Sequence, residues 1–385
     1  MGELRAAPVS LAAGSPEPGR TVRFMMPGAV DDPGAPSGGN TYDRRVCREL
    51  PQLGWRLHEH RVAGGWPRPS AGARAELART LAESADGSLV LLDGLVACAA
   101  PETLVPEAGR LRLAVLVHLP LADETGLAPD VAAALDAAER STLRAATAIV
   151  ATSDWAARRL RDHHGLAARR VHVAVPGADI APLAAGTASG TGGGPRLLCV
   201  ASVTPRKGQH LLVEALAGVA DLPWGCSLVG GPGGDPGYAA RVRELISRHG
   251  LDGRIHLAGP RNGPELNASY AAADLLLLTS HAETYGMAVT EALARGVPVL
   301  ATAVGGVPEA LGRAPDGGLP GALVPPDDPA ALAAALRRWL TDSGERHRAK
   351  SAARRRRTAL AGWETTARAL AKALEHTRQH PLEAA

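Results

Sequence analysis

The stretch from Ala273 to Thr302 constrains the fold most, because it reads as strand, loop, helix and strand in direct succession. Leu275 to Leu278 is a short, wholly apolar run, which is typical of a strand buried on both faces of a parallel sheet. Met287 to Arg295 has helical composition, and Gly296 is a common stop signal. Residues 297–302 (VPVLAT) predict a second buried strand. We therefore expect an open α/β sheet.

The polar loop of this unit, residues 280–286, lies beyond the carboxyl end of the first predicted strand. Open α/β sheets bind their ligands in the crevice outside the carboxyl ends of the strands. The helix that follows points its first N–H groups into that crevice, where they would hold an anion. Phosphate is the best candidate for this anion.

Two carboxylates, Glu283 and Glu291, frame the start of this helix. Each alone has an ordinary explanation: Glu283 as an acid favoured by the helix dipole, and Glu291 as a surface residue. A glycosidase acid pair is a poor fit, because eight helical positions rise by ~12 Å. The carboxyl groups of glycosidases lie ~5–9.5 Å apart.

Glu283 and Glu291, with seven residues between them inside the pattern E-x-Y-G-M, resemble the signature of the family 4 retaining glycosyltransferases. This resemblance implies the GT-B fold, in which two Rossmann-like domains face each other across a cleft. It also implies that Glu283 contacts hydroxyls of the donor sugar and that Glu291 holds the ribose diol of the nucleotide. In that family the backbone of the intervening turn binds the diphosphate, and here the turn is Thr284, Tyr285, Gly286 and Met287.

Composition agrees with a globular protein of this size. Hydrophobic residues make up 45% and charged residues 21% of the 385 residues, so the chain can bury two or three cores. The net charge of +3 is too small to indicate nucleic-acid binding. No apolar run reaches the ~20 residues of a membrane span, and no signal peptide is evident.

The cysteines indicate the redox compartment. Cys47, Cys98, Cys199 and Cys226 are widely spaced and lie in or near apolar runs, which favours reduced core thiols over disulfides. We therefore expect a cytoplasmic protein.

The first strand, residues 21–28, leads into a polar loop that ends at Gly38 and Gly39, where a helix begins. A strand-to-helix turn favours glycine in any case. The G-G-N sequence nevertheless resembles the family's loop that closes over the donor phosphates, and glycine lets backbone N–H groups approach an oxyanion closely.

Three further strands are predicted in this half, at residues 55–62, 88–94 and 111–120. His58 and His60 on the first of them could form a metal pair, but with no third ligand nearby a partly exposed strand face is expected.

His118 ends the last of these strands. A lone histidine there is usually structural, but its position resembles the family's active-site histidine, which meets the donor sugar. Asp93 lies at the mouth of the preceding strand, and Asp123 and Glu124 in the next loop are candidates for acceptor contacts.

Arg206 and Lys207 follow a predicted strand at residues 196–202. The phosphate-binding pattern G-x-x-x-x-G-K-[ST] is absent, and Arg206 and Lys207 instead resemble the family's R-K-G diphosphate clamp. Many family members carry Gly-Arg where this chain has Ala201 and Ser202. We therefore expect Arg206 to supply the missing charge.

Other sequence patterns limit the chemistry. The glycine loop of residues 226–234 is not G-x-G-x-x-G, so a dinucleotide site is not predicted. The chain also lacks the D-x-D pair of metal-dependent transferases, H-E-x-x-H and G-x-S-x-G. We expect no cofactor and no metal.

The expected organisation begins with a flexible tail (1–20) and a first Rossmann-like domain (21–177) on the acceptor side. A linker (178–195) rich in Ala, Gly, Ser and Thr leads to a second Rossmann-like domain (196–362) that binds the nucleotide-sugar. A terminal helix (363–385) is expected to cross back to the first domain.

The second domain ends in a basic run, residues 346–357. Basic helices can lie on anionic membranes, but this run has few apolar residues beside it, so we expect a solvated helix; contact with a membrane surface is possible but not indicated.

The predicted function is retaining, metal-independent transfer of a hexosyl group from a UDP- or GDP-type sugar to an acceptor hydroxyl. Two alternatives stay open: a non-catalytic nucleotide-sugar-binding protein, and a GT-B epimerase or phosphorylase. A phosphorylase needs a cofactor lysine, and the chain has only Lys207, Lys350 and Lys372. The sequence does not indicate the acceptor or the oligomeric state.

Overall fold

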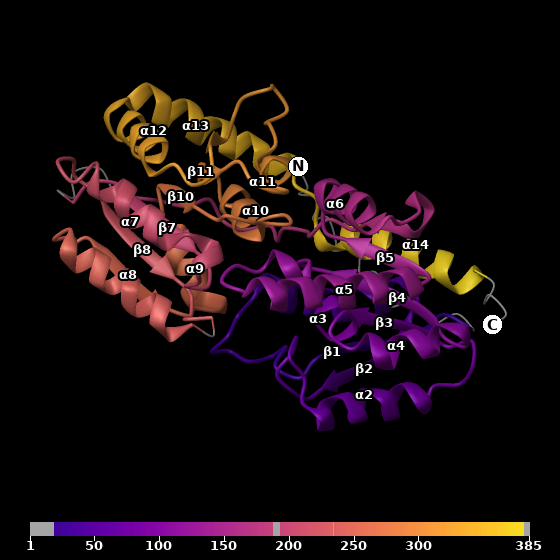
Figure 1. The fold of residues 1–385 in the computed structure, drawn as a ribbon. Coiled ribbons are helices and arrows are strands. Elements are labelled where there is room, and N and C mark those ends of the chain that lie inside the picture. The colour runs from indigo at the N-terminus through magenta and orange to yellow at the C-terminus, as the bar shows by residue number, and fades with distance from the viewer. Residues whose placement is uncertain (1–18, 188–192, 234, 381–385) are drawn as a thin grey trace, which may run out of the picture.

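The computed structural model describes residues 19–187, 193–233 and 235–380. These residues form two parallel sheets of six strands each, both covered by helices (Figure 1). We call the sheet of β1–β6 with its helices the first domain, and the sheet of β7–β12 with its helices the second domain. The predicted GT-B architecture is therefore confirmed. The tail before residue 19, residues 188–192 of the linker and the end after residue 380 lie outside the described residues.

The first sheet has the order β2-β1-β3-β4-β5-β6. Its β3, β4 and β5 are buried along almost their whole length, which is why their sequences are continuous apolar runs. The predicted strands of this half are all present. The strands are β1 Thr21–Pro27, β2 Arg56–Val62, β3 Leu89–Asp93, β4 Arg112–Val117, β5 Ala148–Ala151 and β6 Val171–Val173.

The helices of the first domain begin at side-chain caps in several places. The hydroxyls of Ser37, Ser70 and Ser153 accept hydrogen bonds from the first turns of α1, α2 and α6. The helices are α1 Gly38–Glu49, α2 Ala71–Ala82, α3 Gly94–Ala97, α4 Pro101–Leu104, α5 Pro129–Ala145 and α6 Asp154–His164.

The second sheet has the order β12-β11-β10-β7-β8-β9. Its strands are β7 Arg196–Val200, β8 Gly225–Val229, β9 Ile255–Gly259, β10 Leu275–Leu278, β11 Val299–Thr302 and β12 Gly321–Val324. Its helices are α7 Gln209–Ala217, α8 Pro236–Arg248, α9 Gly263–Ala271, α10 Met287–Ala294, α11 Val307–Leu311, α12 Pro329–Thr341 and α13 Ser343–Arg356. The strand, helix and strand expected between residues 273 and 302 are β10, α10 and β11.

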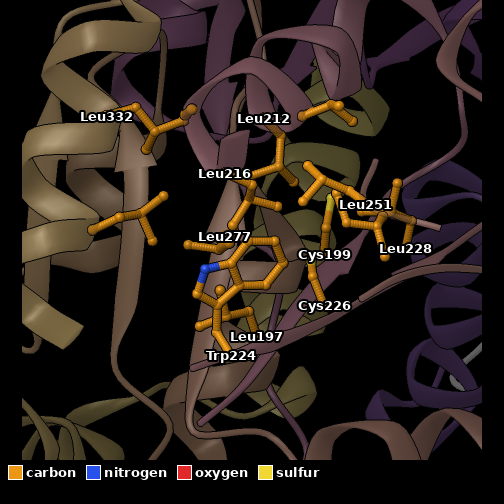
Figure 2. Packing of buried hydrophobic residues seen from close by; sticks show 14 of the residues in the cluster. Leu197, Cys199, Leu212, Leu216, Trp224, Cys226, Leu228, Leu251, Leu277 and Leu332 are labelled. Carbon is orange, nitrogen blue, oxygen red and sulfur yellow. The ribbon is translucent and has the colours of Figure 1, made fainter. Parts of the chain in front are cut away.

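The core of the second domain is built from leucines around Trp224 (Figure 2). Cys199 and Cys226 pack beside them as free thiols. Burial raises the pKa of Cys199 to about 12, so this thiol stays protonated and unreactive. Aromatic residues make up only 3% of the chain, so small and branched side chains fill most of this core.

Helix α14 (Trp363–Gln379) packs on the first domain, although it follows the second in sequence (Figure 1). The rings of Trp363 and Tyr42 meet edge to face with centroids 5.7 Å apart. The hydroxyl of Thr366 donates to the carbonyl of Val175 at 2.7 Å. The two domains are thus joined by the end of the chain as well as by the linker.

Two predictions about flexible or solvated segments need correction. Residues 178–187 follow the surface of the second domain, where the Asp274 carboxylate accepts hydrogen bonds from the backbone of Thr187 and Arg196. The basic run is only partly solvated, because Arg346 donates to the carbonyls of Trp339 and Leu340. Arginines there satisfy free carbonyls at the end of a helix.

Candidate functional site

A cavity of about 420 Å³ lies between the carboxyl edges of the two sheets. It is the place where the connections of parallel sheets leave room for a ligand. Every residue predicted to bind the donor or to act in catalysis lines it: Gly38, Gly39, His118, Arg206, Lys207, Glu283, Thr284, Tyr285, Gly286, Met287 and Glu291.

Glu283 lies just beyond β10 and is 8% exposed. Its carboxylate forms an ion pair with Lys207 and accepts a hydrogen bond from the hydroxyl of Ser280 at 2.8 Å. Burial opposes its charge, but the adjacent Lys207 and Arg206 cations hold the pKa of Glu283 below its ordinary value. Burial also lowers the pKa of Lys207, against the attraction of Glu283. The carboxylate is thus charged and held in one orientation.

Glu291 lies inside α10, and its orientation comes from Tyr270. The phenol of Tyr270 donates to Glu291 Oε2 at 2.7 Å, and Tyr270 is completely buried. Burial raises the pKa of Glu291. The guanidinium of Arg295 lies 4.7 Å from the centre of the Tyr270 ring. Sequence reasoning missed Tyr270, although tyrosine is rare in this chain, with only 4 in total.

The turn before α10 leaves the first N–H groups of that helix without a side-chain cap. Gly286 has φ of 96°, in the region that favours glycine, and so lets the chain turn into the helix. Uncapped N–H groups at a helix start are an anion site. The turn therefore has the backbone geometry that the sequence predicted for it.

Gly305 and Gly306 support this turn from behind, and sequence reasoning did not identify them. The N–H of Gly306 donates to the carbonyl of Glu283 at 3.0 Å. A Cβ atom on Gly305 would lie 1.7 Å from the oxygen of Glu283, and one on Gly306 would lie 2.1 Å from the oxygen of Thr284. Only glycine fits at both positions, and the pair G-G before V-P-E is the signal that could have shown this.

His118 lies opposite, on the first domain, between two buried carboxyl groups. Its Nε2 is 2.8 Å from Asp43 Oδ1 and 3.7 Å from Asp93 Oδ2. Burial raises the pKa of Asp43 to about 7 and that of Asp93 to about 8, and it lowers the pKa of His118. Near neutral pH Asp93 is therefore mostly protonated and Asp43 only partly so, beside a neutral imidazole. Asp43 was not predicted, because it lies inside α1, far from His118 in sequence.

Two groups in the described residues bring three ligand-type atoms within 4.8 Å of one another: Asp43, Asp93 and His118, and Asp136, His163 and His164. Asp93 and His118 of the first group line the cavity, whereas the second group does not. Neither His58 nor His60 belongs to such a group among the described residues.

Arg206 points toward the first domain. Its Nε lies 3.1 Å from both carboxylate oxygens of Glu124. Asp123, the other acceptor candidate, pairs instead with Arg159 at 3.0 Å. Arg206 is thus in the cavity, as predicted, and its charge is matched by a carboxylate of the opposite domain.

The domains also meet at Thr284. Its hydroxyl donates to the carbonyl of His118 at 2.5 Å, and its carbonyl accepts from the hydroxyl of Ser153 at 2.5 Å. Nearby, the Glu309 carboxylate accepts from the backbone N–H groups of Asp154 and Trp155 at the start of α6. Contacts of this kind, between segments distant in sequence, hold the cavity closed on one side.

The family model that matches this chain covers most of the second domain. The profile of the family described as "Glycosyl transferases group 1" matches residues 189–356, which hold Arg206, Lys207, Glu283 and Glu291. Over these residues the chain is similar to the group 1 glycosyltransferases, in agreement with the resemblance seen in the sequence.

Two relatives with similar sequences are D-inositol 3-phosphate glycosyltransferases. The one from Kineococcus radiotolerans is 35% identical over 250 residues, which cover 60% of this chain and 57% of that protein. The one from Geodermatophilus obscurus is 34% identical over 249 residues, which cover 61% of this chain and 54% of that protein. The chain thus spans about half the length of the curated relatives it matches.

Solved structures share the fold of this chain at low sequence identity. Sucrose-phosphate synthase from Thermosynechococcus elongatus superposes with a TM-score of 0.72 at 22% identity, covering 92% of this chain and 98% of that one. HepE from Anabaena, solved in complex with UDP-glucose, has a TM-score of 0.71 at 19% identity, covering 92% and 99%. No helix among the described residues is long and apolar enough to cross a membrane.

Proposed function

We propose that the protein transfers a hexosyl group from a nucleotide-sugar to an acceptor hydroxyl, with retention of configuration and without a metal. One observation carries this proposal. Glu283, Glu291, Lys207 and the uncapped start of α10 converge on a single cavity between two domains. A nucleotide-sugar presents the matching groups: sugar hydroxyls, a ribose diol and a diphosphate.

In the proposed complex the ribose diol, the diphosphate and the sugar hydroxyls of the donor each bind a different part of the site. Glu291, oriented by Tyr270, accepts hydrogen bonds from the ribose diol. The N–H groups of α10 and the cation of Lys207 hold the diphosphate, and Glu283 accepts from hydroxyls of the sugar. The likeness to HepE, which was solved with UDP-glucose, supports a UDP-type donor, and a GDP-type donor is the alternative.

Transfer then needs no side-chain nucleophile. The acceptor hydroxyl attacks the anomeric carbon from the face that the leaving diphosphate vacates, and a phosphate oxygen takes the hydroxyl proton. One carbon–oxygen bond forms while the bond to the diphosphate breaks. Negative charge grows on the leaving group, and Lys207 and Arg206 stabilise it there.

Arg206 has to change partners for this role. In the unliganded arrangement Glu124 neutralises it across the domain gap. A bound diphosphate would compete with Glu124 for the guanidinium, since both are anions that accept from it. We propose that donor binding exchanges the two.

The proposal of a metal-free site is supported by the charges in the cavity. The cations and helix N–H groups already offset a diphosphate, and burial raises the pKa of Asp93 to about 8, so this carboxyl is mostly protonated near neutral pH and a poor metal ligand. The four free cysteines, three of them buried, support a reducing compartment such as the cytoplasm as the place where the protein acts.

A donor panel tests the proposal. Thermal unfolding with UDP-, GDP- and ADP-sugars should identify one nucleotide that raises the melting temperature, since a ligand that binds only the native state stabilises it. Mass analysis of the products then separates transfer from epimerisation, because an epimerase leaves the mass of the donor unchanged. A protein that binds a donor and never releases nucleotide would be a binding protein instead.

A further inference from the structure

The first-domain wall of the cavity, which faces the acceptor in the proposed function, combines polar side chains with an apolar set. The leucines and prolines of this set are Pro36, Pro67, Leu95, Leu119, Pro120, Leu121 and Pro176. Leu95 is 36% exposed, at the start of the short helix α3, and it is one of the few large apolar side chains that the described residues leave exposed. Apolar surface left in water gains free energy when a ligand covers it.

The charged side chains also differ between the two walls of the cavity. Among the described residues that line it, the arginines and lysines are Arg206, Lys207 and Arg261, and all three belong to the second domain. The first-domain wall carries carboxyl groups instead, Asp93 and Glu124. The basic side chain of this wall among the described residues is His118, and burial keeps it neutral by lowering its pKa.

An acceptor phosphate would therefore meet no fixed cation on this wall. Proteins bind phosphate with arginine, lysine or the start of a helix. The start of α3 is occupied, because Asp93 Oδ1 accepts from the N–H of Leu95 at 2.6 Å. The start of α1 is capped by Ser37, whose hydroxyl accepts from the N–H of Asn40 at 3.0 Å. A phosphate beside the Glu124 carboxylate would be desolvated without a partner.

We propose that the acceptor is a neutral hydroxyl compound with an apolar portion, such as an aryl or alkyl glycoside, and not a phosphorylated sugar or cyclitol. The apolar portion lies against Leu95 and the prolines of the first-domain wall, and the reacting hydroxyl faces the donor. This inference rests on the proposed function and names its acceptor class. It separates this chain from the relatives named for D-inositol 3-phosphate.

Calorimetry on the protein saturated with UDP tests the inference, with phenyl β-D-glucoside, myo-inositol and D-inositol 3-phosphate as probes. We expect phenyl β-D-glucoside to bind at least about tenfold more tightly than myo-inositol, since contacts in an apolar pocket contribute roughly 10-fold or more. We expect the phosphate of D-inositol 3-phosphate to add no affinity over myo-inositol.

Matched variants locate the effect. Leu95→Ser should weaken phenyl β-D-glucoside binding about tenfold and leave UDP binding unchanged. Leu319→Ser, at another exposed leucine that lies outside the cavity, should change neither. The melting temperature of each variant without ligand shows that the fold is intact.

Three results overturn the inference: tighter binding of D-inositol 3-phosphate than of myo-inositol, no glucoside binding to the UDP-loaded protein, or an unchanged glucoside affinity in Leu95→Ser. Failure of UDP, GDP and ADP alike to bind the wild-type protein is a different outcome. It would refute the proposed function first, and the acceptor class with it.

Discussion

Removing the Glu291 carboxylate should affect both donor binding and the stability of the fold, because the side chain has two partners. Substitutions at these positions can therefore distinguish the two effects. In the proposed complex it accepts from the ribose diol, and in the free protein it accepts from Tyr270 at 2.7 Å. Glu291→Ala removes a charge-assisted hydrogen-bond partner of the nucleotide, which is worth about 1.5–3 kcal/mol. The dissociation constant for UDP should therefore rise roughly 10- to 150-fold.

The same substitution leaves the Tyr270 hydroxyl buried without a partner. That should lower the free energy of unfolding by about 1–3 kcal/mol. Tyr270→Phe in the Glu291→Ala background removes the stranded hydroxyl, so the double variant should regain part of the stability and none of the UDP affinity. Tyr270→Phe alone should weaken UDP binding by less than Glu291→Ala, because it frees the carboxylate without removing it.

Urea unfolding and calorimetry with UDP measure both quantities on the four proteins of this cycle. Unchanged UDP affinity in Glu291→Ala would refute the assignment of Glu291 to the ribose. Equal recovery of stability and of affinity in the double variant would show that the two effects have one structural cause.

Three more outcomes are expected. Gly306→Ala should abolish UDP binding, because its Cβ would lie 2.1 Å from the Thr284 oxygen and displace the turn; UDP titration measures this, and wild-type affinity would disprove the role of the turn. Lys207→Ala and Arg206→Ala should each lower kcat roughly 10²-fold and raise donor KM by a smaller factor. Wild-type kcat in Arg206→Ala would show that Arg206 is a partner of Glu124 alone. Stability should fall as pH rises from about 4 to about 8, because the folded pKa of Asp93, about 8, exceeds its unfolded value and the folded state holds the extra proton. Asp93→Asn should flatten this fall by more than ~1 kcal/mol in unfolding measured between pH 5 and pH 8, and a steep fall in the variant would contradict it.

The parts of the site that were predictable lie within single strand–loop–helix units. Glu283 and Glu291 share one unit with the turn between them, and Lys207 lies in the corresponding loop after β7, so local patterns and a family resemblance suffice. His118 was predicted for the same reason, since it directly follows the buried strand β4.

The parts that were missed depend on packing between distant segments. Tyr270 orients Glu291 across 21 positions, Asp43 meets His118 across 75, and Gly306 supports a turn from another loop. Neither the hydrophobic periodicity nor the motif spacing of a single segment can predict such contacts. The partner of Arg206 was missed because Glu124 belongs to the opposite domain, 82 positions away.

The anomeric form of the first sugar released tests the central claim most directly, and it needs no knowledge of the acceptor because water can replace it. The protein is incubated with UDP-α-glucose and EDTA, and GDP-α-mannose in parallel, while proton NMR follows the sugar before it mutarotates. We predict that one donor yields its nucleotide and the α-anomer first, that EDTA does not prevent this, and that Glu291→Ala slows it. Initial release of the β-anomer, or turnover that stops with EDTA and returns with magnesium, would contradict retaining, metal-independent transfer at this site.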